Sequence, residues 1–186
     1  TDIWNIDYVT DIAREYKKLC PSVPTWVGGP EVSYEVEAFL RENPYIDGVM
    51  IGEGEDTFRE LCGYYAHKRK LSDIAGIAFR KNSTGNRTSV NNIGGNKAGE
   101  IVFTSPRPIK NMSEIPFCYD TLDDFSNRII YYESSRGCPF SCSYCLSSVD
   151  KTLRFRDTEI VKRELKFFID QKVPQIKFLD RTFNCN

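Results

Sequence analysis

Apolar side chains recur at three- and four-residue steps in three stretches of the first 70 residues, and this spacing predicts helices that each bury one face. Asn5 is a plausible N-cap for the first helix, and Pro21 is expected to end it. The apolar positions are Ile6, Val9, Ala13, Tyr16 and Leu19 in the first helix, Val32, Val36, Phe39 and Leu40 in the second, and Phe58, Leu61, Tyr64 and Tyr65 in the third. Short apolar runs at 25–27 and 49–51 separate them and read as buried strands. This alternation predicts an α/β fold with a parallel sheet covered on both faces.

A glycine-rich loop follows each of these two strands: Gly28-Gly29-Pro30 after the first and Gly52-Glu53-Gly54-Glu55 after the second. In open parallel sheets, ligands bind beyond the carboxyl ends of the strands, and glycine lets the backbone approach a ligand closely. Gly28, Gly29, Gly52 and Gly54 are therefore candidate cofactor-binding residues, although tight strand-to-helix turns explain the glycines equally well. Neither loop has the G-x-G-x-x-G spacing of a dinucleotide site, and the two glutamates argue against a bound phosphate.

The middle of the chain changes in character. Apolar runs near 74–79 and 100–104 predict a small antiparallel β-hairpin, and prolines punctuate the connector that follows. The acidic residues Asp120, Asp123 and Asp124 are interpreted as a solvated turn. The expected domain division is 1–71, 72–128 and 129–186.

The last third predicts one strand–helix–strand unit. A strand at 129–134 precedes a cysteine-rich loop, Asp157 or Thr158 opens a helix, and a second strand follows at 175–180. The apolar side of the helix is expected to carry Ile160, Val161, Leu165, Phe168 and Ile169. This order is typical of the opening unit of a (βα) barrel, in which chemistry lies at the carboxyl ends of the strands.

The cysteine-rich loop holds Cys138, Cys142 and Cys145 in the spacing C-x3-C-x2-C. Such thiolates select zinc, copper(I) or iron–sulfur clusters. A structural zinc site needs four ligands, so a zinc-stabilised α/β binding module without catalysis would have to recruit Cys118 or Cys185 as well. A cluster with three protein thiolates instead keeps one iron open for a substrate or cofactor. An electron carrier, which needs no open iron, is a further alternative.

The three-cysteine spacing, with the aromatic residue Tyr144 before the last cysteine, resembles that of the radical S-adenosylmethionine (SAM) superfamily. Residues 129–186 are similar to the first part of its (βα) barrel. Residues 1–70 resemble the C-terminal part of the flavodoxin-like (Rossmann-like) cobalamin-binding domain that precedes the barrel in one large subgroup. The matching motifs there are Val27-Gly28-Gly29-Pro30, Gly52-Glu53-Gly54-Glu55-Asp56-Thr57-Phe58 and Gly76-Ile77-Ala78-Phe79-Arg80.

This resemblance implies an enzyme in which Cys138, Cys142 and Cys145 hold a 4Fe-4S cluster that binds SAM and cleaves it reductively to a 5′-deoxyadenosyl radical. Tyr144 would lie against the adenine. Asp180 would contact the methionine ammonium with the help of Thr182, because Asp180-Arg181-Thr182 stands where the family usually has Gly-Gly-Glu. No side chain is predicted to act as a catalytic acid or base.

Cobalamin is an expectation from kinship alone. The Asp-x-His-x-x-Gly run that serves base-off cobalamin binding is missing from the sequence, whose single histidine is His67. We interpret His67 as a solvated charge at a helix C-terminus.

The amino-acid composition limits which binding partners and which cell compartment are expected. The 25 basic and 26 acidic residues nearly balance, so nothing indicates nonspecific binding to nucleic acid or to a membrane. Seven cysteines, three of them clustered, fit a reducing cytoplasm better than a disulfide scaffold. The expected partners are a small-molecule or unknown substrate and a reductant such as flavodoxin or ferredoxin. We also expect the sequence to be a piece of a longer enzyme and to be inactive by itself.

Overall fold

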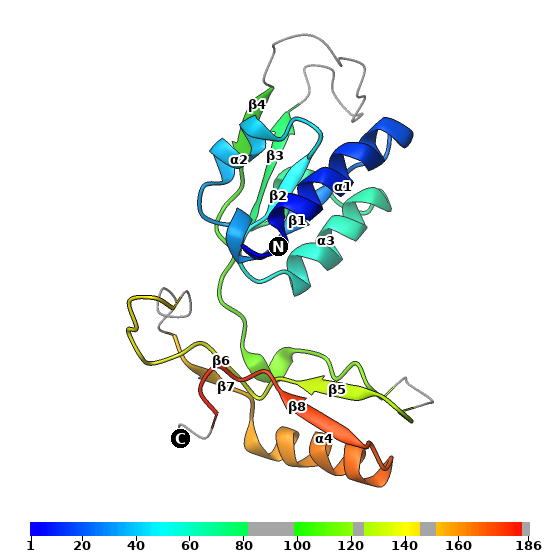
Figure 1. The fold of residues 1–186 in the computed structure, drawn as a ribbon, viewed down its shortest axis with the longest axis vertical. Coiled ribbons are helices and arrows are strands. Elements are labelled where there is room, and N and C mark those ends of the chain that lie inside the picture. The colour runs from blue at the N-terminus through cyan, green and yellow to red at the C-terminus, as the bar shows by residue number, and fades with distance from the viewer. Residues whose placement is uncertain (82–98, 121–124, 146–151, 184–186) are drawn as a thin grey trace. The chain divides into compact units, whose positions relative to one another are not determined.

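The computed structural model describes residues 1–81, 99–120, 125–145 and 152–183 (Figure 1). The chain divides into two compact units, Thr1–Ile109 and Lys110–Asn186. Each unit has α/β architecture. Among the described residues, no helix is both long enough and apolar enough to cross a lipid bilayer.

The first unit is built on a four-stranded sheet with the order β1-β2-β3-β4. Its strands are β1 (Trp26–Gly28), β2 (Gly48–Met50), β3 (Ile77–Lys81) and β4 (Glu100–Phe103). β1 and β2 are parallel, as predicted, whereas β3 is antiparallel to both β2 and β4. The predicted hairpin therefore forms, but it extends the sheet of the first unit, and the compact unit runs on to Ile109. The edge of β2 would otherwise leave backbone hydrogen-bonding groups unpaired, and β3 of the hairpin pairs with it.

Helices cover both faces of this sheet. They are α1 (Ile6–Leu19), α2 (Val36–Glu42) and α3 (Glu55–Tyr65), and short 3-10 turns lie at Pro30–Val32 and Leu71–Asp73. Ala13 of α1 and Leu40 of α2 share a core with Val49 of β2. Leu61 of α3 packs with Ile77 in a second core, on the other side of the strands. Alternate side chains of a strand point to opposite faces, so three-residue strands suffice to separate the two cores.

Two details of α1 differ from the prediction. Tyr16 and Leu19 are exposed, and the buried residue of the last turn is Lys17. The Lys17 Nζ donates to Asp47 Oδ2 at 2.6 Å and to the Val23 carbonyl at 2.7 Å, so its charge is satisfied where an apolar side chain was expected. Asn5 precedes the helix but makes no capping hydrogen bond; its Oδ1 accepts from the backbone N–H of Asp2 instead.

The second unit contains the predicted βαβ unit. Its elements are η3 (Met112–Glu114), β5 (Ile129–Tyr132), β6 (Ser135–Arg136), β7 (Arg154–Phe155), α4 (Thr158–Asp170) and β8 (Gln175–Phe178). β5 and β8 pair in parallel, and α4 lies between them in the sequence. The Asp157 carboxylate accepts hydrogen bonds from the N–H groups of Glu159 and Ile160, so Asp157 is the N-cap. Phe168, fully buried, is the centre of the core.

A buried polar cluster crosses the second unit, where the sequence predicted only apolar contacts. Glu164 of α4 accepts two hydrogen bonds from the Arg156 guanidinium, at 2.9 and 2.5 Å, and one from the Tyr132 hydroxyl at 2.6 Å. Arg156 also donates to the Met112 carbonyl at 2.6 Å. Burial, the hydrogen bond to Glu164 and the Glu164 charge raise the pKa of Tyr132 well above its ordinary value. In exchange, Ile169, expected on the apolar side of α4, is exposed.

Candidate functional site

The cysteine loop begins and ends at a short antiparallel ladder in the second unit. β6 pairs with β7 in antiparallel fashion, Ser135 opposite Phe155 and Arg136 opposite Arg154, so the two ends of the loop are joined by backbone hydrogen bonds. Gly137, directly before Cys138, has a φ of 95°, and a Cβ there would collide with the backbone carbonyl of Thr152. Only glycine fits this position comfortably, because of both the positive φ and the close approach.

The three cysteines differ in exposure: Cys138 and Cys145 are half-buried and Cys142 is exposed. The Cys145 N–H donates to the Cys142 carbonyl at 3.1 Å, which closes a turn between them. No disulfide joins the cysteines in the described ranges. In those same ranges, no three His, Cys, Asp or Glu side chains gather closely enough to hold a metal ion, so the shared cluster remains a prediction from spacing. Three thiols on one short loop still fit an iron–sulfur cluster by their donor chemistry.

The two aromatic residues of the loop are exposed. Phe140 is 59% exposed and Tyr144 is 90% exposed. Both rings are therefore open to solvent. The contact of Tyr144 with an adenine remains a prediction, and a ring this exposed is accessible to stack on one.

Asp180, just beyond the carboxyl end of β8, ties that strand to the start of the cysteine loop. Its Oδ1 accepts from the N–H groups of Ser134 and Ser135 at 2.8 and 3.0 Å, and its Oδ2 accepts from the Ser134 hydroxyl. Two ionised carboxylate oxygens offer about four acceptor positions. With three of these in use, Oδ2 can accept one more hydrogen bond, as the predicted contact with an ammonium requires.

Thr182, in the same segment after β8, lies next to the first cysteine of the loop. Its hydroxyl lies 3.1 Å from the Cys138 Sγ, within hydrogen-bond distance for sulfur. Thr182 is half-buried, and its neighbour Arg181 is exposed. Two of the three predicted SAM contacts, Asp180 and Thr182, thus lie against the cysteine loop.

The candidate glycines of the first unit fall into two kinds. Gly52, with a φ of 76°, and Gly54 follow β2, and a Cβ at either would meet nothing within 4 Å. Gly28 and Gly29 follow β1; a Cβ at Gly28 would touch Met50, and one at Gly29, with a φ of 110°, would collide with the backbone of Thr1. The backbone at Gly52 and Gly54 is therefore open to a ligand, whereas packing explains Gly28 and Gly29.

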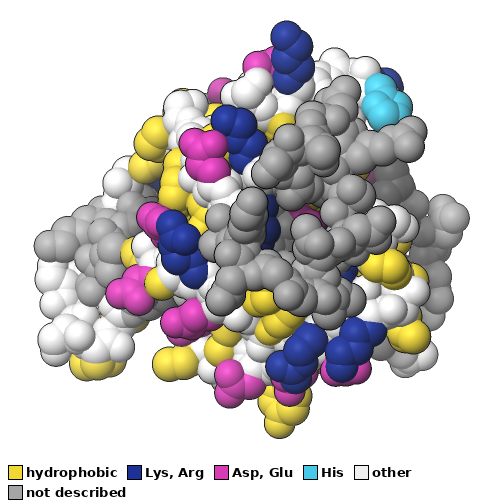
Figure 2. All heavy atoms as spheres, turned by 90° about the horizontal axis from the view of Figure 1, so that it is seen from above, with side chains coloured by type: hydrophobic (Ala, Val, Ile, Leu, Met, Phe, Trp, Pro, Cys, Tyr) yellow, Lys and Arg dark blue, Asp and Glu magenta, His cyan; other side chains and the backbone are white. Residues whose placement is uncertain are grey.

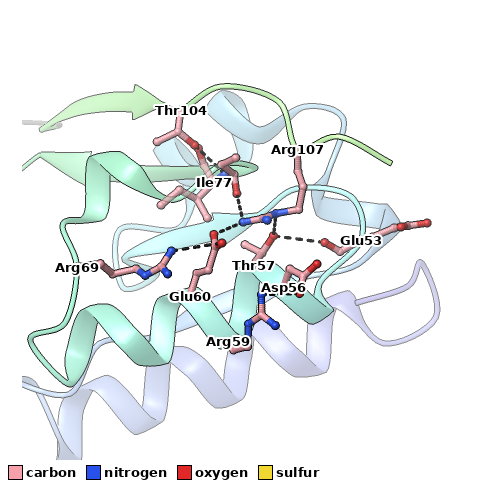
Figure 3. A network of polar contacts seen from close by, with 10 residues as sticks. Glu53, Asp56, Thr57, Arg59, Glu60, Arg69, Ile77, Thr104 and Arg107 are labelled. Atoms are coloured by element: carbon pink, nitrogen blue, oxygen red, sulfur yellow. Dashed lines mark hydrogen bonds and ion pairs between the residues drawn. The ribbon is translucent and has the colours of Figure 1, made fainter. Parts of the chain in front are cut away.

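A polar network, shown in Figure 3, supports the loop after β2. The buried Thr57 accepts from Arg107 Nε at 2.7 Å, and its hydroxyl lies 3.4 Å from the Glu53 carbonyl. Arg107 also forms an ion pair with Glu60 and donates to the Ala75 carbonyl at 3.0 Å. Arg69 pairs with the other oxygen of Glu60 at 3.3 Å. The loop that carries Gly52 and Gly54 is thereby fixed at its entry into α3.

Sequence reasoning missed the residues that support both candidate sites. Ser134 and Ser135 could have been suspected from their position between β5 and the first cysteine. Arg107 gives no comparable signal, because its partners are about 30 to 50 residues away in the chain. His67, as expected, is exposed at the end of α3. On the face seen in Figure 2, basic and acidic side chains are interspersed with hydrophobic ones, in line with the balanced charge.

Residues 1–62 match the family model of the B12 binding domain. Nearly the whole chain also aligns with curated relatives. An uncharacterized methyltransferase of Pyrococcus horikoshii is 34% identical over 185 residues, which cover 94% of this chain and 37% of the relative. The cobalamin-dependent radical SAM methyltransferase TokK of Streptomyces tokunonensis is 28% identical, with 97% of this chain and 26% of TokK covered. The chain thus spans only 26–37% of the length of these relatives.

Solved structures agree with the fold. The cobalamin-dependent SAM radical enzyme OxsB, with aqua-cobalamin and SAM bound, superposes with a TM-score of 0.67 over 96% of this chain and 24% of that chain, at 21% identity. The radical SAM methyltransferase TsrM from Kitasatospora setae superposes with a TM-score of 0.63 over 97% of this chain and 34% of that chain, at 18% identity.

An α/β unit whose residues 1–62 match the B12 binding domain, followed by a βαβ unit with a three-cysteine loop, places the chain in the class of α/β proteins that carry a B12 binding domain. Within that class, the chain belongs to the cobalamin-binding subgroup of the radical SAM superfamily.

Proposed function

We propose that the protein is a cobalamin-linked radical SAM enzyme of the methyltransferase type, in which Cys138, Cys142 and Cys145 hold a 4Fe-4S cluster. One observation carries the proposal: a three-cysteine loop follows the carboxyl end of β5, in a chain whose residues 1–62 match the B12 binding domain. Chemistry at the carboxyl ends of parallel strands is the general rule for such barrels.

A cluster held by these three cysteines would supply the one electron needed for reductive cleavage of SAM to methionine and a 5′-deoxyadenosyl radical. The electron would come from a small reductant such as flavodoxin or ferredoxin, and the substrate would be a small molecule. This chain's own residues would hold the cysteine loop in place and orient SAM. The β6–β7 ladder closes the loop, and Asp180 fixes its start through Ser134 and Ser135.

The same residues would position SAM. The fourth acceptor position of Asp180 would receive the methionine ammonium, with the Thr182 oxygen beside it, and Tyr144 would stack on the adenine. Support comes from the placement of Asp180 and Thr182 against the cysteine loop and from the exposed Tyr144 ring.

Cobalamin would approach the loop after β2. Gly52 and Gly54 leave the backbone open there, and the Arg107 network holds the loop in place. The single histidine of the chain, His67, lies just past the C-terminal end of α3, whereas this loop precedes the N-terminal end, so we assign His67 no role toward cobalt.

The proposal is tested by anaerobic reconstitution of the full-length protein with iron and sulfide. We expect about four irons per chain, reductive cleavage of SAM with dithionite, and loss of both when any of the three loop cysteines is changed to alanine. Cys62→Ala is the matched control, because Cys62 is an exposed cysteine on α3. One tightly bound zinc and no iron would instead identify the zinc-stabilised binding module.

Cobalamin binding is tested separately at Gly54. Its Cβ direction is open and its φ of −94° suits any residue, so Gly54→Leu adds bulk without backbone strain. We expect Gly54→Leu to weaken hydroxocobalamin binding at least tenfold, and Gly54→Ser to leave it nearly unchanged. Equal affinities for wild type and Gly54→Leu, measured by titration, would exclude this loop as the cobalamin seat.

A further inference from the structure

We propose that the Thr182 hydroxyl raises the reduction potential of the cluster by donating a hydrogen bond to the sulfur of Cys138. The inference rests on the proposed function, and it starts from the 3.1 Å distance between Thr182 Oγ1 and Cys138 Sγ. It makes Thr182 a positioning residue that acts through a cluster ligand.

The contact is built into the unit by its neighbours. Thr182 lies two residues after Asp180, and Asp180 is bound to the backbone of Ser134 and Ser135. Ser135 begins β6, which leads directly through Gly137 to Cys138. The donor and the sulfur therefore belong to two segments that the same carboxylate holds together, and their distance does not depend on a long side chain.

The direction of the hydrogen bond follows from the chemistry of the ligand. A cysteine that binds iron is a thiolate, which can accept a hydrogen bond but has no proton to donate, so the hydroxyl must be the donor. Adding one electron to a cluster increases the negative charge on its sulfur ligands. A donor aimed at such a sulfur stabilises the reduced form more than the oxidised form and so raises the potential.

This role is compatible with the contact predicted for Thr182 from the sequence. The hydroxyl has one proton and two acceptor lone pairs. With the proton on Cys138, the oxygen can still accept from an ammonium group, and hydrogen bonds in such a chain strengthen each other. Thr182 would then link SAM binding to the electron density on Cys138.

The experiment measures the midpoint potential of the reconstituted full-length protein by a redox titration followed by electron paramagnetic resonance. Four variants are compared with wild type: Thr182→Val, which keeps the shape but has no donor; Thr182→Ala; Thr182→Ser, which keeps the hydroxyl; and Thr10→Val. The last is a matched control, because Thr10 lies on α1 and its hydroxyl bonds only to the Asp7 carbonyl among the contacts described.

We expect about four irons per chain in every variant, a lower potential in Thr182→Val and Thr182→Ala, and a potential near wild type in Thr182→Ser and Thr10→Val. Equal potentials in loaded wild type and Thr182→Val would overturn the role of Thr182 and leave the proposed function standing. Loss of iron from both Thr182→Val and Thr182→Ala would make the threonine a requirement for holding the cluster, which also contradicts a tuning role. A wild-type protein that takes up no cluster would remove the proposed function and this inference together.

Discussion

At the scale of single residues, the least predictable feature is the buried trio of Tyr132, Arg156 and Glu164. Glu164 does give a signal in the sequence, since it falls between Val161 and Phe168 on the apolar side of α4. Its partners give none, because Tyr132 comes from β5 and Arg156 from the segment after β7. Periodicity locates a polar residue on a buried face but does not identify what pairs with it.

Replacing Glu164 tests this trio. Glu164→Ala leaves the Arg156 charge and the Tyr132 hydroxyl buried without their acceptor, so we expect the free energy of unfolding to fall by about 3–5 kcal/mol. Lys166→Ala is the control on the same helix; its ion pair with Asp170 is exposed, and the expected loss is at most about 0.5 kcal/mol. Urea denaturation measures both. A loss from Glu164→Ala as small as that from Lys166→Ala would contradict the packing described here.

Tyr65 provides a test by pH. Burial, and to a smaller extent the charge of Asp47, raises the pKa of Tyr65 to about 12, against a hydrogen bond from Trp26 that lowers it. The unfolded chain loses this proton near pH ~10. The contribution of Tyr65 is therefore fully present below pH ~10 and is lost as the pH rises toward about 12. We expect Tyr65→Phe to show a shallower alkaline loss of stability than wild type in denaturation at a series of pH values. Tyr8→Phe, at a site 72% exposed, should follow the wild-type curve.

At the scale of elements, the sequence predicted the types and ends of the helices better than their buried faces. The range of α1 agrees with the apolar periodicity, yet Tyr16 and Leu19 are exposed and Lys17 is buried. Helix ends are set by local chemistry such as Pro21, whereas burial depends on what packs against the helix. Asp47, which pairs with Lys17, lies in the segment before β2, a partner that the helix pattern cannot show.

The two predicted N-caps make a matched pair. Asp157 accepts two backbone hydrogen bonds at the start of α4, and Asn5 makes none to α1. Asp157→Ala is expected to lower the free energy of unfolding by about 0.5–2 kcal/mol, and Asn5→Ala by less. Thermal or urea denaturation of the two variants gives the comparison. A larger loss from Asn5→Ala than from Asp157→Ala would show that the capping bonds do not decide the stability of these helix ends.

At the scale of the whole molecule, the α/β class and the βαβ unit could be predicted from strands and helices that alternate along the chain. The position of the β3–β4 hairpin in the sheet could not be predicted in this way. Its own two strands are signalled locally, but the pairing of β3 with β2 depends on an open sheet edge. The candidate site shows the same limit: the spacing indicates three thiols on one loop, while the contacts of Asp180 and Thr182 come from the segment after β8, about 45 residues later.

The two units have separate hydrophobic cores, one around Leu40 and one around Phe168. Each side chain is fully buried, so Leu40→Ala and Phe168→Ala should each lower stability by about 2–5 kcal/mol. We expect the effects to be local: hydrogen exchange followed by mass spectrometry should accelerate within 1–109 for Leu40→Ala and within 110–186 for Phe168→Ala. Acceleration spread evenly over both units in either variant would mean that they unfold as one.

The ladder between β6 and β7 has a consequence for the proposed cluster. The pairs Ser135–Phe155 and Arg136–Arg154 hold together the two ends of the segment that carries the three cysteines, whether or not a metal is bound. Much of the entropy that an open chain would lose on wrapping around a metal has then been removed during folding, as in a preorganised chelator. Gly137 permits the close approach of the two ends at Thr152, so we expect a larger residue there to weaken this closure and to let competing chelators remove the proposed cluster more easily.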